Sequence, residues 1–171
     1  MTGVRLGDRL LQIGCSNPSL LGAVSSKVGL SGRACVVVSD EAASARAARG
    51  AAQAGVLIEV TQAAVDRCPF DEESFDVVVV DSTDGRLGAL GGTGRHACLS
   101  DARRVLAPRG RIVVIEAGSP AGLSRFLRPT PPVDHTYQAS GGPSGALEAA
   151  GFRAVRTLAE RDGLVFVEGT K

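Results

Sequence analysis

The sequence predicts an α/β fold: a doubly wound, mostly parallel sheet with helices on both faces and an antiparallel strand at its C-terminal end. Short apolar runs rich in β-branched residues recur along the chain, as buried parallel strands require, and longer segments with helical patterning separate them. The last segments, 152–160 and 163–171, are typical of a terminal strand pair. The five expected parallel strands lie at 9–14, 34–39, 56–61, 75–81 and 111–116.

Capping residues mark the expected helices. Asn17 is a suitable N-cap for a first helix, with Pro18 at its first position and Gly29 placed to end it. An alanine-rich segment at 42–54 predicts a second helix, closed by Gly55. Two further helices are expected at about 97–106 and 144–150.

The chain of 171 residues fits one domain, 1–171, with one core. Within it, residues 118–145 are dominated by Gly, Ser and Pro, so we expect little regular structure and interpret the segment as a loop-rich insertion or lid. Four of its side chains are candidate substrate contacts or, alternatively, ordinary solvated loop residues. They are Arg125, Arg128, His135 and Tyr137.

Composition narrows the classes of partner. Lys and Arg number 19 and Asp and Glu 18, without a long run of like charges, so neither nucleic acid nor a membrane surface is an expected partner. The four cysteines are not closely paired and there are two histidines, which predicts reduced thiols and no metal site. No leader-like or membrane-spanning segment is visible, so we expect a cytoplasmic protein that binds a small molecule.

Five segments occur in a specific order. GDRLLQIGCSNPSLL includes the first strand, Asp40 ends the second, and CPFDEESFDVVVVD leads into the fourth. RRVLAPRGRIVVIE leads into the fifth strand, and ALEAAGFRAV with GLVFVEGTK closes the chain. Together they resemble the class I S-adenosylmethionine (SAM) dependent methyltransferases, most closely the quinone-biosynthesis C-methyltransferases with a methyltransferase type 11 core. The resemblance implies a Rossmann-like fold, SAM as cofactor, and methyl transfer to an unidentified small molecule.

Ligands of doubly wound sheets bind at the carboxyl ends of the strands, where the strand order reverses. Gly14 would let the backbone approach a ligand there. Asp40 is suited to accept both hydroxyls of a ribose, or alternatively to cap the second helix. Asp81 is the candidate base or substrate contact, unless it forms a capped turn with Ser82 and Thr83. The cofactor contacts that the resemblance implies are Gln12, Gly14, Cys15, Ser16, Asp40, Glu41, Ala64, Val65 and Asp81.

The cofactor segment departs from the family pattern at several positions. Gln12 and Ala64 stand where the family has acids, while Ser16 and Pro18 replace glycines, and Cys15 is expected to be a small buried residue. These changes favour an alternative, a non-catalytic methyltransferase-like domain that serves as an assembly or interaction module. A nicotinamide-dependent dehydrogenase is a weaker alternative, since only Gly14 of its glycine-rich fingerprint is present. A homo-oligomer or a partner protein could cover the crevice.

Overall fold

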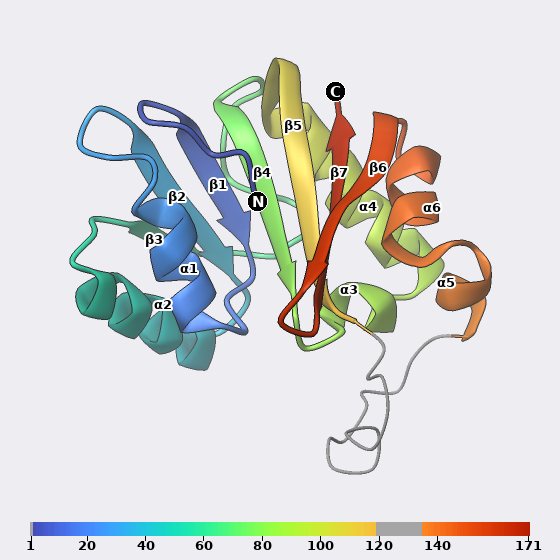
Figure 1. Cartoon of the computed structure of the whole chain (residues 1–171), viewed down its shortest axis with the longest axis horizontal. Helices are drawn as coiled ribbons and strands as arrows, with labels where there is room; N and C mark the ends of the chain where they lie inside the picture. The colour runs from blue at the N-terminus through green and yellow to red at the C-terminus, as the bar shows by residue number, and fades with distance from the viewer. Residues whose placement is uncertain (1, 119–134) are drawn as a thin grey trace.

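A computed structural model describes residues 2–118 and 135–171. Its seven strands form one sheet in the order β3-β2-β1-β4-β5-β7-β6 (Figure 1). The strands are β1 (Arg9–Ile13), β2 (Arg33–Val38), β3 (Glu59–Gln62), β4 (Phe75–Ser82), β5 (Leu106–Ala117), β6 (Arg153–Arg161) and β7 (Leu164–Thr170). The helices are α1 (Pro18–Ser25), α2 (Glu41–Ala54), α3 (Arg86–Ala89), α4 (Gly92–Val105), α5 (His135–Ala139) and α6 (Gly142–Ala149).

The predicted topology is confirmed. Strands β3, β2, β1, β4 and β5 pair in parallel, whereas β7 runs antiparallel to both β5 and β6. Strand β1 lies between β2 and β4, so the chain reverses its direction of winding there. In Figure 1 the parallel strands end at the lower edge of the sheet, which we call the carboxyl edge. The opposite edge, where they begin, is called the amino edge.

Helices cover both faces of the sheet, as predicted (Figure 1). One face packs against α4 and α6, which contribute Leu99 and Leu147 to the largest apolar cluster. The other face packs against α1 and α2. These two helices approach closely: a Cβ on Gly50 would lie 2.5 Å from the carbonyl oxygen of Pro18. Small residues in α2 therefore allow it to lie against α1.

The expected helix caps are present. The side chain of Asn17 accepts a hydrogen bond from the amide of Leu20, and Pro18 begins α1. Helix α1 ends at Ser25, before the expected Gly29, and α4 begins at Gly92, earlier than expected. The four-residue helix α3 was not predicted from the sequence.

The third strand is shorter than predicted. The amides of Gly55 and Val56 donate to the carbonyls of Ala52 and Ala51, which closes α2. Val56 thus belongs to the helix terminus, and Leu57 is 90% exposed. The apolar run that suggested a strand from residue 56 becomes β3 only at Glu59.

The expectation of sparse regular structure across 118–145 was wrong for its last part, where α5 and α6 begin. Each helix has a buried apolar anchor, Tyr137 in α5 and Leu147 in α6. Arg125 and Arg128 lie outside the described residues, as does all of 119–134. In the part of the chain that the structure describes, no helix has the length and apolar character to cross a membrane.

Candidate functional site

The carboxyl edge brings most of the candidate residues together. Register places Ile13 of β1 beside both Val37 and Val80, so the turns that follow β1, β2 and β4 lie next to one another. Gly14 and Asp40 follow β1 and β2 closely, and Asp81 lies at the end of β4. This is the point where the strand order reverses and where ligands of such sheets bind.

Asp81 is buried and fixes the turn between β1 and α1. Its Oδ2 accepts hydrogen bonds from the amides of Ser16 and Asn17, at 2.9 and 3.0 Å. Its Oδ1 accepts from the amide and hydroxyl of Thr83, at 3.1 and 2.7 Å. A carboxylate has about four acceptor sites, so these hydrogen bonds occupy all of them. The alternative prediction, a capped turn of Asp81 with Thr83, is therefore present. Asp81 in addition binds the two amides that precede α1.

Gln12 and Gly14 also stabilise the turn that follows β1. The Gln12 side chain is fully buried, and its Nε2 donates to the carbonyl of Gly14 at 3.0 Å, while its Oε1 has no partner within 2–118 and 135–171. Gly14 has φ +82°, and a Cβ there would lie 3.0 Å from the carbonyl oxygen of Asp81. Glycine is thus required by the backbone conformation and by the close approach of β4.

Cys15 is a structural residue, as expected. It is 3% exposed, and its carbonyl accepts from the Nε of Arg46 at 3.0 Å. Burial, and to a smaller extent the charge of Asp81, raises the pKa of the Cys15 thiol to about 11. The thiol is therefore protonated at neutral pH and is a poor nucleophile. Together with the half-buried Ser16, it completes the turn after β1.

Asp40 is the N-cap of α2, but its carboxylate retains exposed surface. Oδ1 accepts from the amide of Ala43 at 2.8 Å, and Oδ2 accepts from the hydroxyl of Ser39 at 2.9 Å. These bonds, helped by Arg46 and Arg86, hold the pKa of the carboxyl below its ordinary value. With the side chain 49% exposed, an ionised acceptor faces the carboxyl edge.

Among the described residues, the side chains of the remaining candidates, Glu41, Ala64 and Val65, form no hydrogen bond or ion pair. Glu41 is exposed in the first turn of α2, where a negative charge favours the helix dipole. Ala64 is exposed after β3, and Val65 is half-buried against the core. Ala64 offers no side-chain acceptor at the position where the resemblance implies an acid.

Sequence reasoning missed a buried network at the end of β5. Oε1 of Glu116 accepts from the hydroxyl of Tyr137 at 2.7 Å and from that of Ser82 at 3.2 Å. Burial raises the pKa of Glu116, and the two hydrogen bonds oppose that shift. The sequence does contain one indication of this network, because Glu116 lies at the end of a predicted strand, as Asp81 does.

Tyr137 is buried in this network, so the expectation of a loop residue in contact with solvent or substrate was wrong. Its ring packs beneath the guanidinium of Arg95, 4.4 Å from the ring centroid, and against Gly88, where a Cβ would lie 3.0 Å from the ring. Burial, and then the charge of Glu116, raises the pKa of Tyr137. His135, in the same short helix, is exposed.

Other features of the described residues bear on ligands. Cavities of about 510 and 190 Å³ lie elsewhere, and no candidate residue lines either one. All four cysteines are buried and free. Across 2–118 and 135–171, no group of three or more His, Cys, Asp or Glu side chains could hold a metal ion.

Comparisons with known proteins point to one family. A model of the "Methyltransferase domain" family matches residues 10–110. The chain is 32% identical over 169 residues to the ubiquinone/menaquinone biosynthesis C-methyltransferase of Hahella chejuensis, covering 93% of this chain and 61% of that protein. It is 26% identical over 125 residues to the protein of the same name from Idiomarina loihiensis, covering 72% of this chain and 48% of that one. The chain thus spans about half to three-fifths of these relatives.

Solved structures share the fold. A SAM dependent methyltransferase from Aquifex aeolicus matches with a TM-score of 0.76 at 18% identity, over 99% of this chain and 85% of that one. The structure titled "PigF with SAH" matches with a TM-score of 0.66 at 16% identity, over 96% of this chain and 50% of that one. At these identities the likeness establishes the architecture.

Proposed function

The chain belongs to the methyltransferase domain family, and we propose that it transfers a methyl group from SAM to a small molecule. The observation that carries the proposal is the ionised, half-exposed carboxylate of Asp40 at the carboxyl edge. Membership of the family supports the cofactor, and the turn after β1 supports its position beside the point where the strand order reverses.

The residues at this edge fit an adenosine ligand. A carboxylate offers about four acceptor sites, and in Asp40 the amide of Ala43 and the hydroxyl of Ser39 occupy two of them. The remaining two match the vicinal hydroxyls of a ribose. The unpaired Oε1 of Gln12 is a second acceptor beneath the same turn, in place of the family's acid.

In the proposed mechanism the chain contributes position. When bound, SAM supplies an electrophilic methyl group whose leaving group is neutral. Asp40 would orient the ribose, and Gly14 lets the turn after β1 approach the backbone of β4 closely. Asp81 acts through the turn, because its carboxylate is engaged by Ser16, Asn17 and Thr83. It is thus proposed as a positioning residue in place of the base first considered.

The acceptor is proposed to be a small molecule. The relatives are named ubiquinone/menaquinone biosynthesis C-methyltransferases, so a carbon of a quinol ring is the first acceptor class to test. The balanced reaction replaces an acceptor hydrogen by the methyl group and releases one proton. No side chain is assigned to receive that proton.

Calorimetry with S-adenosylhomocysteine (SAH) tests the cofactor site directly. We expect saturable binding by the natural chain and a loss of affinity of roughly tenfold or more in Asp40→Asn, because a neutral amide accepts ribose hydroxyls less well. Asparagine is as good an N-cap as aspartate, so this variant keeps α2 capped. The matched control is Glu72→Gln, which removes an exposed negative charge away from Asp40 and should change affinity less than twofold.

Two results would overturn the proposal. One is the absence of saturable SAH binding by the natural chain at millimolar ligand, which would leave the non-catalytic interaction module. The other is equal weakening by both variants, because that would reduce the role of Asp40 to general electrostatics.

A further inference from the structure

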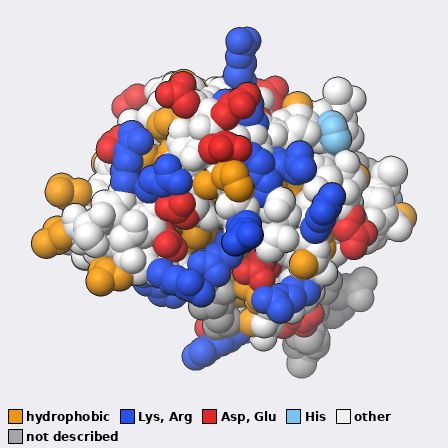
Figure 2. Space-filling model, turned by 90° about the horizontal axis from the view of Figure 1, so that it is seen from above, with side chains coloured by type: hydrophobic (Ala, Val, Ile, Leu, Met, Phe, Trp, Pro, Cys, Tyr) orange, Lys and Arg blue, Asp and Glu red, His pale blue; other side chains and the backbone are white. Residues whose placement is uncertain are grey.

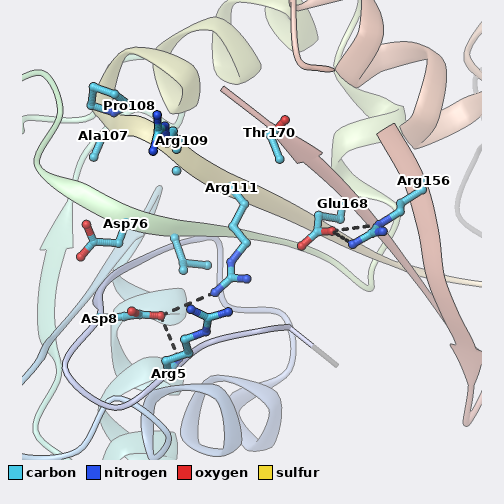
Figure 3. A pocket seen from close by; sticks show the side chains of 12 residues that line it. Arg5, Asp8, Asp76, Ala107, Pro108, Arg109, Arg111, Arg156, Glu168 and Thr170 are labelled. Carbon is cyan, nitrogen blue, oxygen red and sulfur yellow. Dashed lines mark hydrogen bonds and ion pairs between the residues drawn. The ribbon is translucent and has the colours of Figure 1, made fainter. Parts of the chain in front are cut away.

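A second candidate binding site lies at the amino edge of the sheet, far along the strands from Asp40. A cavity of about 510 Å³ opens there, in the size range of small-molecule sites. Its lining comes from the segment before β1, the start of β4, the first part of β5 and the β6–β7 pair, as Figure 3 shows. Figure 2 views this edge from above, where basic and acidic side chains are interspersed.

The carboxylates of this cavity are already paired with arginines. Glu168 accepts from Arg156 at 2.9 Å, and Asp8 lies 3.8 Å from the guanidinium of Arg111 (Figure 3). The third, Asp76, accepts two hydrogen bonds from the side chain of Arg9, just outside the cavity, at 2.8 and 3.1 Å. The acidic groups are therefore neutralised within the structure.

Two guanidinium groups in the lining are not paired with a carboxylate of the described residues. The side chains of Arg5 and Arg109 are exposed and have no hydrogen-bond or ion-pair partner among residues 2–118 and 135–171. They approach the cavity from different segments, Arg5 from the chain before β1 and Arg109 from the irregular first part of β5. The site thus has a local excess of positive charge, although the net charge of the whole chain is only +1.

Arg109 has an unusual backbone conformation. Arg109 has φ +65°, a left-handed conformation that favours glycine and is costly for other residues. An arginine held in this conformation at the mouth of a cavity, without a partner, points to a ligand that its guanidinium binds.

We propose that this cavity binds a small phosphate-bearing molecule through Arg109 and Arg5. A guanidinium presents paired N–H donors that match the oxygens of a phosphoryl group. Arg111 and Arg156 also line the cavity, but each is already paired with a carboxylate, Asp8 and Glu168 respectively. The site is separate from the proposed SAM site, because it lies at the opposite ends of the parallel strands.

Titration with inorganic pyrophosphate at low ionic strength, followed by calorimetry, tests the site. We expect saturable binding by the natural chain and roughly tenfold weaker binding by Arg109→Gly. Glycine suits the left-handed backbone, so this variant keeps the turn. Thermal melting followed by circular dichroism verifies that it is folded. Arg5→Gln should weaken binding in the same direction.

The matched control is Arg67→Gln, which removes an exposed positive charge after β3 and should change pyrophosphate affinity less than twofold. Equal weakening by Arg67→Gln and Arg109→Gly would overturn the proposal, since binding would then follow net charge. So would the absence of saturation at millimolar pyrophosphate, or unchanged affinity in folded Arg109→Gly. SAH binding is measured on the same samples, so failure here is distinguishable from failure of the proposed methyltransferase site.

Discussion

Acidic side chains at opposite edges of the sheet illustrate two different ways of being satisfied. At the carboxyl edge, Asp81 and Glu116 are buried and accept hydrogen bonds from amides and hydroxyls of the chain. At the amino edge, Glu59 and Arg33 form a largely exposed ion pair. Buried hydrogen bonds fix geometry, whereas water and salt screen exposed pairs. Asp81 thus holds a turn in place at the carboxyl edge, whereas the Arg33–Glu59 pair at the amino edge is open to exchange with ions of the solvent.

The largest effect is expected from Asp81→Ala. It leaves the amides of Ser16 and Asn17 without their acceptor, so the free energy of unfolding should fall by roughly 3 kcal/mol or more. Denaturation in urea measures this change. At the amino edge, Glu59→Ala removes an exposed pair and should cost less than about 1 kcal/mol. Similar losses in the two variants would contradict the contrast between the edges.

The next effect is a pH dependence from Glu116. Because burial raises its pKa in the folded chain above the ordinary glutamate value, its contribution to stability is present at pH below that ordinary value. The contribution is lost as pH rises through the raised pKa. Stability curves measured against pH should therefore show the natural chain losing stability relative to Glu116→Gln over this window. A difference between the two proteins that stays constant with pH would show that Glu116 is not shifted.

The smallest effect is expected at the amino edge from Arg109→Gly. Relief of the left-handed backbone should raise the free energy of unfolding by roughly 0.5 to 1 kcal/mol. Arg67→Gly is the matched variant, because Arg67 is not among the non-glycine residues with positive φ, and it should lower stability. If both substitutions destabilise the chain equally in urea, Arg109 carries no backbone strain.

Much of the fold could be predicted because the buried strands are continuous apolar runs with turn residues at their ends. The run at Val77–Val80 gave β4, and Asn17 and Gly55 gave the ends of two helices. Prediction failed where tertiary structure decided the outcome. The backbone amide of Val56 closes α2 by donating to the carbonyl of Ala51, which the strand-like composition of the run could not reveal.

The candidate site was predictable only in part, for a similar reason. Strand ends located Gly14, Asp40 and Asp81, since the carboxyl ends of neighbouring parallel strands share one edge. The hydrogen bonds of Asp81 to Ser16 span 65 residues, and those of Glu116 to Tyr137 span 21. No local sequence pattern encodes either pairing. Asp81, predicted as a base, therefore proved to hold the turn after β1, and Tyr137, predicted as a loop residue, proved to be buried.

The most direct test of the account is a nuclear magnetic resonance titration of the isotope-labelled chain with SAH. The account predicts amide shifts at Gly14, Asp40 and Glu41 that saturate together, while the amides of Arg109 and Thr170 at the amino edge stay unchanged. Saturable shifts confined to the amino edge, or no shifts at millimolar SAH, would contradict the claim that the carboxyl edge holds an adenosine ligand.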